Sequence, residues 1–375
     1  MTSFRKKQIF RAASLCLAFT FFLSSGPSAA SPGYVQAREG KLERDGERYF
    51  PLGINYYPRN KIWEDFWLQY DEAETGKDLV RIEALGFNSI RIFIHHPSVT
   101  NPFHQEKLLT NLHHFLNEAS RRNILTIVTL FDWAQLYADP DERELREILE
   151  KIVMPLKDHP GILAWDIKNE PDLDYKFYRS PEIVNHWLEK VLGIVREMDP
   201  NHLITVGWLH VPPEAASLLQ KCDFISFHHY GYERKVGKIL KDLQKRYPGK
   251  PVVLEEYGYF TLPLIRNEEG QKAYLRTVMR EALLEDVDGL FVWTLYDHAP
   301  FQGVERPLQE NFFGILRQNY EPKKAAALFS AFDPESFKAR TGFSFFPFSG
   351  NCSGIFGWAT ELAVSLNGVI RRDQR

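Results

Sequence analysis

Cysteine is scarce in this chain of 375 residues, which has 3 cysteines and no group of them at the spacing of a zinc site. Cys16 lies in an N-terminal segment that we expect to be removed. A disulfide between Cys222 and Cys352 is possible in an exported chain, but Cys222 adjoins an apolar strand, which favours a buried thiol. We therefore expect no metal site and no cofactor.

An excess of one charge sign is also missing, because the formal net charge is only -3. Without a concentrated basic excess to neutralise phosphates, nucleic acid is not expected as a partner. A glycine-rich phosphate loop is absent after the first predicted strand, 51–58, which argues against a doubly wound nucleotide-binding sheet.

The N-terminus has the layout of a secretory signal peptide. Four basic residues up to Arg11 precede an apolar run over 12–23, and small residues before and at Ala30 suit cleavage. The run is too short to span a bilayer comfortably, and Leu15 before Cys16 does not suit a lipid anchor. We predict a signal peptide over 1–30, no stable membrane anchor, and a secreted or periplasmic protein.

After a hairpin with its turn at Asp45-Gly46, short apolar runs alternate with amphipathic stretches. The predicted strands are 51–58, 89–94, 125–131, 161–165, 203–206, 224–227, 251–256 and 289–294. The predicted helices are 77–85, 107–121, 141–156, 182–198, 214–219, 235–246, 271–284 and 323–329. This alternation predicts the α/β class, as a single-domain (β/α)8 TIM barrel over 31–335, followed by a C-terminal extension, 336–375, of unknown role.

Two of these strands end in a carboxylate, at the edge where catalytic groups of such barrels lie. One runs into Asn169-Glu170-Pro171, where Pro171 cannot continue the ladder of hydrogen bonds. The other ends in Glu255-Glu256, whose side chains should face opposite ways. Glu256 lies nearer the loop, and we assign it to the site. A carboxylate pair without a metal motif suggests cleavage of a glycosidic bond, although two surface carboxylates would give the same pattern.

Further polar and aromatic residues interrupt or end the other strands. Arg91 lies inside an apolar strand and needs a carboxylate partner. His228 and Tyr230 follow one strand, and Trp293 follows the last. Each has an ordinary explanation in packing, but together they indicate a site.

With these residues the chain resembles the clan A retaining glycoside hydrolases, especially family 5, over about 51–332. Asn169-Glu170, Glu256-Tyr257-Gly258, Arg91, His228, Tyr230 and Trp293 match motifs of that family. The resemblance implies that Glu170 is the acid/base and Glu256 the nucleophile. It also implies that Arg91, Asn169, His228, Tyr230 and Trp293 bind substrate or support the pair.

Two features depart from the pattern of cellulases. The stretch Phe131-Asp132-Trp133-Ala134 lacks the His that often follows the third strand, which leaves mannan-type activity as open as glucan-type. The stretches 158–165 and 293–297 are similar to the barrel of family 2.

The expected function is hydrolysis of a β-linked oligo- or polysaccharide through a covalent glycosyl-enzyme intermediate. A sugar-binding pseudoenzyme and a transglycosylase remain alternatives. Aromatic residues in loops are candidates for stacking on sugar rings. They are Tyr56, Tyr57, Trp133, Trp208, Tyr259 and Tyr296.

Overall fold

The computed structural model describes residues 33–95, 101–132, 142–177, 180–262, 266–299 and 308–339. The predicted signal peptide, Trp133, Cys352 and the chain beyond 339 lie outside these ranges, so the expectations for them stay predictions.

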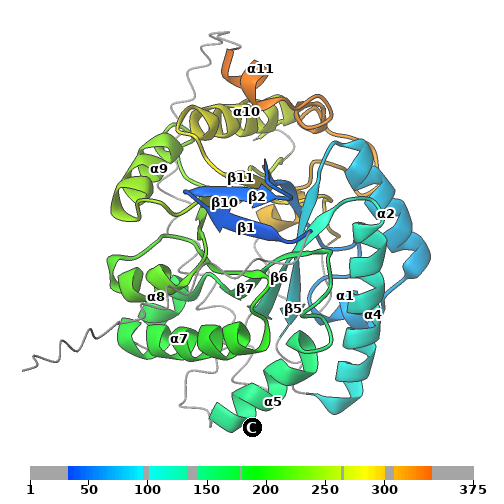
Figure 1. Ribbon diagram of the computed structural model, residues 1–375. Helices are drawn as coiled ribbons and strands as arrows, with labels where there is room; N and C mark the ends of the chain where they lie inside the picture. The colour runs from blue at the N-terminus through cyan, green and yellow to red at the C-terminus, as the bar shows by residue number, and fades with distance from the viewer. Residues whose placement is uncertain are drawn as a thin grey trace, which may run out of the picture. The chain divides into compact units, whose positions relative to one another are not determined.

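Eight parallel strands close into a barrel in the order β10-β11-β4-β5-β6-β7-β8-β9. The predicted (β/α)8 barrel is therefore confirmed, and helices surround its strands (Figure 1). The strands are β4 (Leu52–Asn55), β5 (Ser89–His95), β6 (Leu125–Asp132), β7 (Ile162–Asn169), β8 (Leu203–Trp208), β9 (Ile225–His229), β10 (Val252–Tyr257) and β11 (Gly289–Val292).

The helices lie in the connections between strands, as the sequence pattern predicts. The α-helices are α1 (Glu64–Leu68), α2 (Glu72–Ala84), α4 (Pro102–Ser120), α5 (Glu142–Val153), α6 (Asp174–Phe177), α7 (Pro181–Met198), α8 (Ala216–Lys221), α9 (Lys235–Arg246), α10 (Glu268–Leu284) and α11 (Pro334–Ala339). The 3-10 helices are η1 (Pro171–Leu173), η2 (Pro213–Ala215), η3 (Leu308–Phe312) and η4 (Ala326–Leu328).

Local sequence accounts for where several helices begin. The side chain of Asp71 accepts a hydrogen bond from the Glu74 amide at the start of α2, and Asn267 accepts one from Gly270 at the start of α10. Pro181 occupies the first turn of α7, where its missing N–H costs no helical hydrogen bond.

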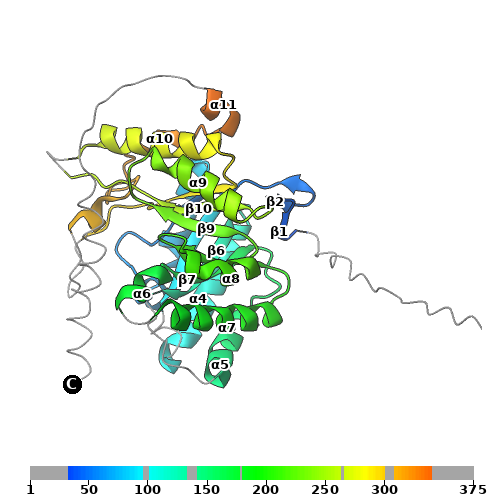
Figure 2. The same cartoon turned by 90° about the vertical axis from the view of Figure 1, so that its left-hand side faces the viewer.

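A three-stranded sheet of β1 (Val35–Arg38), β2 (Lys41–Arg44) and β3 (Glu47–Arg48) lies beyond one end of the barrel (Figure 2). Asp45 and Gly46 form its second turn with positive φ angles of 53° and 82°, as the Asp-Gly signal predicts. Val35 and Leu42 join Leu125, Leu163 and others at the starts of barrel strands in one apolar cluster. The sheet therefore covers the N-terminal end of the barrel.

The predicted helix 323–329 is wrong, because only the 3-10 helix η4 forms there. Lys323 donates its backbone N–H to the Ile315 carbonyl, and Leu316 pairs with Pro322 in a β-bridge. These bonds tie the start of the segment to the barrel, so its backbone groups are not free to start an α-helix at Lys323. A further helix, α11, was not predicted, and it crosses the expected boundary at 336.

Cys222 is a buried free thiol at 1 % exposure. Burial raises its pKa to about 12, which makes the thiol unreactive. In the ranges that the structure covers, no helix combines the length and apolarity that crossing a membrane requires.

Candidate active site

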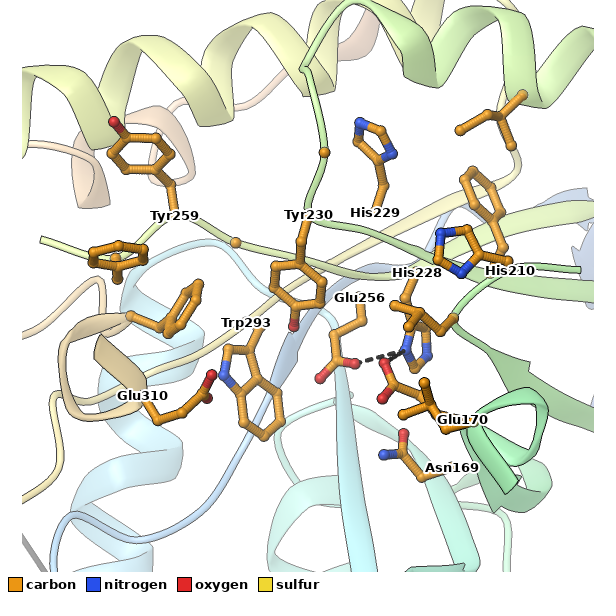
Figure 3. A pocket seen from close by; sticks show the side chains of 18 of the residues that line it. Asn169, Glu170, His210, His228, His229, Tyr230, Glu256, Tyr259, Trp293 and Glu310 are labelled. Atoms are coloured by element: carbon orange, nitrogen blue, oxygen red, sulfur yellow. Dashed lines mark hydrogen bonds and ion pairs between the residues drawn. The ribbon is translucent and has the colours of Figure 1, made fainter. Parts of the chain in front are cut away.

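A cavity of about 900 Å³ opens at the C-terminal ends of the barrel strands (Figure 3). The sequence-predicted residues in its lining are Asn169, Glu170, His228, Tyr230, Glu256 and Trp293. Only Arg91 of the predicted set is not in the lining, and it lies completely buried. The fold thus brings seven residues from β5, β7, β9, β10 and the end of β11 to one edge, because parallel strands end together.

Glu170 and Glu256 face each other across His228 in this cavity. The His228 Nδ1 atom lies 2.8 Å from Glu170 Oε1 and 2.7 Å from Glu256 Oε2. The nearest oxygens of the two carboxyl groups lie within 4.8 Å of each other. Carboxyl groups that act by direct attack are about 5–5.5 Å apart, whereas inverting pairs need about 6.5–9.5 Å, and this site belongs to the short-distance group.

The backbone at Glu170 is strained. Its φ of 45° and ψ of 50° lie in the left-handed region, which non-glycine residues adopt at a cost. Pro171 ends the strand as predicted, and the Glu170 N–H donates to the Gly207 carbonyl of the neighbouring strand at 2.7 Å. Strain of this kind gathers at functional sites, where the surrounding structure holds one side chain in place.

The two carboxyl groups have pKa values shifted in opposite directions. Burial raises the pKa of Glu170, and the negative charge of Glu256 adds to that rise. Burial alone would raise the pKa of Glu256 as well, but the charge and hydrogen bond of His228 lower it, with help from Arg91 and the Tyr230 hydroxyl. One group is thus favoured as an acid and the other as an anion.

His228 is favoured as a cation. Burial opposes its protonation, but the charge of Glu256 and the close contacts of Nδ1 with Glu170 and Glu256 raise its pKa well above the ordinary value. The side chain is fully buried in contact with both carboxyl groups. A cation here stabilises the ionised form of Glu256.

The partner of Arg91 is Asp166, a residue that the sequence analysis did not name. Arg91 Nη2 lies 2.7 Å from Asp166 Oδ2, and both side chains are inaccessible to solvent. The same nitrogen donates to Asn169 Oδ1 at 2.9 Å. This bond holds the Asn169 amide so that its NH2 group remains available to the cavity. A single acid inside the apolar strand β7 was the signal that could have paired Asp166 with Arg91.

The expectation that only one of Glu255 and Glu256 points to the barrel interior is wrong. Glu255 Oε2 lies 3.8 Å from His228 Nε2, so the two acids approach opposite nitrogens of one imidazole. The register of β10 against β9 shifts between Leu254 and Glu256. Such an irregularity breaks the strict alternation of side chains along a strand, which the sequence does not reveal.

Tyr230 and Trp293 complete the predicted set. The Tyr230 hydroxyl points toward Glu256 in Figure 3 and helps to lower the pKa of that carboxyl group. The indole of Trp293 meets the rings of Tyr57 and Phe93 edge to face, with centroids 6.5 and 6.0 Å apart. This packing fixes one aromatic face in the cavity wall.

Only some of the aromatic residues expected to stack on sugars line the cavity. Tyr57 and Tyr259 do, whereas Tyr56, Trp208 and Tyr296 are fully buried away from it. The hydroxyls of Tyr56 and Tyr296 both donate to Asp78, which explains their burial. Position after a strand does not distinguish a wall residue from a core residue.

Three acidic residues that the sequence analysis did not assign to the site also line the cavity, and one of them, Asp242, belongs to α9. Asp132 ends β6 and accepts a hydrogen bond from the Tyr57 hydroxyl at 3.1 Å. Burial raises its pKa to about 7. Glu310 comes from η3 and lies near Trp293 in Figure 3. The position of Asp132 at a strand end was a usable signal, but Glu310 follows no strand.

Glu170, His228 and Glu256 are the one group of three or more potential metal ligands within the ranges that the structure covers. Their atoms are already engaged with one another through His228. An acid, an anion and a shared imidazole at these distances can support proton transfer and nucleophilic attack.

The closed parallel barrel, with its cavity at the C-terminal ends of the strands, defines a TIM-barrel protein. The model of the family described as Cellulase (glycosyl hydrolase family 5) matches residues 56–298. The chain therefore belongs to glycosyl hydrolase family 5, and the resemblance expected from its motifs is confirmed.

Its relatives divide between two kinds of sugar. Over 180 residues it is 26% identical to the probable mannan endo-1,4-beta-mannosidase C of Aspergillus terreus, covering 40% of this chain and 43% of that one. Over 216 residues it is 26% identical to the beta-glucuronidase of Sus scrofa, covering 52% and 32%. The chain thus spans less than half the length of these two curated relatives.

A solved structure is similar over more of the fold. The exo-beta-1,4-mannosidase Op5Man5 from Opitutaceae bacterium strain TAV5 aligns with a TM-score of 0.67 at 22% identity, over 80% of this chain and 62% of that one. At this identity the likeness supports the barrel architecture alone.

Proposed function

We propose that this protein is a retaining β-glycosidase that hydrolyses an uncharged, mannose- or glucose-type β-glycan by double displacement. The observation that carries the proposal is the approach of Glu170 and Glu256 to within 4.8 Å across one cavity. A sugar-binding pseudoenzyme would not need an acid and an anion held at that distance.

In the first step an oxygen of ionised Glu256 attacks the anomeric carbon. The bond to the leaving oxygen breaks, and Glu170 gives that oxygen its proton. Loss of the Glu256 charge in the ester then lowers the pKa of Glu170. In the second step Glu170 takes a proton from water as the water oxygen attacks the anomeric carbon, and the ester bond breaks to release Glu256 as a carboxylate. Asn169 supplies a donor for a sugar hydroxyl, and Trp293 supplies an apolar face for the ring.

The charges of the cavity favour an uncharged sugar over a uronate. Asp132, Asp242 and Glu310 add three acidic groups to the lining besides the catalytic pair. Arg91 is held by Asp166 below the cavity. The lysines and arginines of the described lining are Lys235, Lys238 and Arg246 of α9 and Arg266 shortly before α10. None of the four lies at the end of a barrel strand, and Arg266 packs over the rings of Tyr259 and Phe260. A uronate carboxylate at the strand ends would face like charges.

The mannan-type relative favours mannose over glucose. The cavity volume of about 900 Å³ suits a ligand larger than one sugar ring. By the predicted signal peptide we also propose that the enzyme acts outside the cytoplasm, and N-terminal sequencing of exported protein tests this. Retention of Met1 would contradict export by cleavage.

The test is the stereochemistry of the first product. Proton NMR during hydrolysis of a β-linked oligosaccharide should show the β-anomer first, and an initial α-anomer would overturn the double displacement. Glu256→Ala should be inactive, and azide should restore turnover as an α-glycosyl azide, because the small anion enters from the vacated side. Glu147→Ala, at an exposed residue of α5, is the matched control and should remain fully active.

A panel of aryl β-mannoside, β-glucoside and β-glucuronide tests the charge argument. The uncharged sugars should be turned over and the glucuronide should not. Preference for the glucuronide would contradict the argument that the acidic lining disfavours a uronate. Product sizes from manno- and gluco-oligosaccharides separate hydrolysis from transglycosylation, since a transglycosylase yields products longer than the substrate.

A further inference from the structure

Glu255 is a fully buried carboxylate that the double displacement does not use. Its carboxyl group is inaccessible to solvent beneath the cavity, and neither of its oxygens has a hydrogen-bond partner in the part of the chain that the structure describes. The nearest basic atoms are His228 Nε2 and Arg91 Nε, each at 3.8 Å. A buried acid without hydrogen bonds lowers the stability of the folded state, so the presence of Glu255 calls for an explanation.

The barrel makes room for this group at Gly207. A Cβ atom there would lie 2.8 Å from both Glu255 Oε2 and Arg91 Nη2, and 3.2 Å from Asp166 Oδ2. Glycine at this point lets β8 approach the cluster of charges closely. The charged groups that face the cluster come from β5 (Arg91), β7 (Asp166 and Glu170), β9 (His228) and β10 (Glu255 and Glu256).

His228 contacts three carboxyl groups through its two ring nitrogens. Nδ1 faces Glu170 and Glu256, whose charges change during the proposed reaction. Nε2 faces Glu255, which is not itself part of the cavity lining. Glu255 therefore exchanges no proton with the substrate in the proposed reaction.

We propose that Glu255 is a positioning residue that keeps His228 doubly protonated throughout the reaction, and above all in the glycosyl-enzyme intermediate. At that stage Glu256 is an ester and Glu170 is a carboxylate that must accept a proton from water. His228 would otherwise pass its Nδ1 proton to Glu170, because a neutral pair is favoured over an ion pair in a buried site. The second carboxylate at Nε2 opposes that transfer and leaves Glu170 free as the base.

This inference rests on the proposed function, and its main test is the second chemical step. We would form the intermediate with a 2-deoxy-2-fluoro glycoside and follow its hydrolysis in the wild type, Glu255→Gln and Glu255→Asp. Glu255→Gln should hydrolyse the intermediate about 10-fold more slowly or worse, which corresponds to a shift of about one pKa unit. Glu255→Asp keeps the charge and should stay closer to the wild type.

The protonation of His228 gives a readout that a merely structural role would not move. Nitrogen-15 NMR of the imidazole, assigned with His228→Gln, should show both nitrogens protonated at pH 7 in the wild-type intermediate. Glu255→Gln should show a neutral ring. The acid limb of its kcat/KM profile should shift to higher pH by about one unit, because a neutral His228 no longer lowers the pKa of Glu256. A ring still doubly protonated in Glu255→Gln would overturn the proposal.

Two outcomes separate this inference from the proposed function. If no glycoside is hydrolysed and no intermediate forms, the proposed function fails, while the His228 titration in the free protein still tests the role of Glu255. If Glu255→Gln does not fold, the nitrogen-15 NMR spectrum of the wild-type intermediate is the remaining test. A singly protonated His228 in that spectrum contradicts the proposal.

Discussion

The two ends of the barrel use buried charge differently. At the N-terminal end, Asp288 is paired with Lys41 at 2.9 Å and accepts the Val252 N–H at 2.9 Å. At the C-terminal end, Glu255 accepts no hydrogen bond from any residue that the structure describes, and Glu170 adopts a strained backbone. At the N-terminal end the buried charge is fully paired and hydrogen-bonded. At the C-terminal end hydrogen bonding is incomplete and one backbone position is strained.

This difference follows the general conflict between stability and activity. Groups selected for a reaction need shifted pKa values and incomplete hydrogen bonding, which lower the stability of the folded state. The apolar cluster around Leu42 and the Lys41 ion pairs lie at the opposite end of the same strands. Changes at one end should therefore affect activity, and changes at the other should affect stability.

The largest expected effect is on activity at the C-terminal end. Glu170→Ala should lower kcat/KM for an unactivated oligosaccharide by about 10³-fold, the contribution of a general acid and base. With a dinitrophenyl glycoside, whose leaving group needs no proton, the first step should be nearly normal. The unfolding midpoint in urea should not fall, and an equal loss on both substrates would contradict the role of Glu170.

The wild-type pH profile belongs to the same prediction. Activity needs Glu256 ionised, which holds above its lowered pKa, and Glu170 protonated, which holds below its raised pKa. The kcat/KM profile should thus be bell-shaped. Its alkaline limb should disappear in Glu170→Ala when the dinitrophenyl glycoside is the substrate.

A smaller effect, on stability, is expected at Asp132. Burial raises its pKa from the ordinary 3.8 to about 7, so the wild type loses stability as pH rises through that range. Asp132→Asn avoids this loss, and its free energy of unfolding should exceed that of the wild type by about 2 kcal/mol at pH 8 but not at about pH 3.5. Urea denaturation at both pH values measures it. An advantage independent of pH would contradict the shifted carboxyl.

The smallest effect is expected at the N-terminal end. Lys41→Met removes the closest partner of the buried Asp288, leaving Arg48 at 3.7 Å. Because Lys41 is partly exposed, we expect a loss of only about 1 kcal/mol of stability, with kcat/KM unchanged. Lys338→Met removes a surface pair with Glu335 and should cost less. Loss of activity in Lys41→Met would contradict the claim that the N-terminal end affects stability and not activity.

Much of the site could be predicted because it depends on local patterns. Alternation of apolar and amphipathic stretches predicts the barrel, and a barrel places strand ends together whatever its loops do. Glu170, Glu256, His228, Tyr230 and Trp293 therefore reach one cavity from the ends of four strands. Glu310 escaped prediction because it comes from η3, where no periodic signal marks the direction of a side chain.

By itself the sequence determined the class of fold, the strand ends that carry acids, and the need of Arg91 for a partner. These features depend on hydrophobic periodicity and residue type, which can be read from a few neighbouring residues. Only the tertiary structure decided that Asp166 is that partner and that Tyr56 and Tyr296 are buried on Asp78. It alone decided that Glu255 shares an imidazole with Glu256, because a register shift in β10 depends on the neighbouring strands.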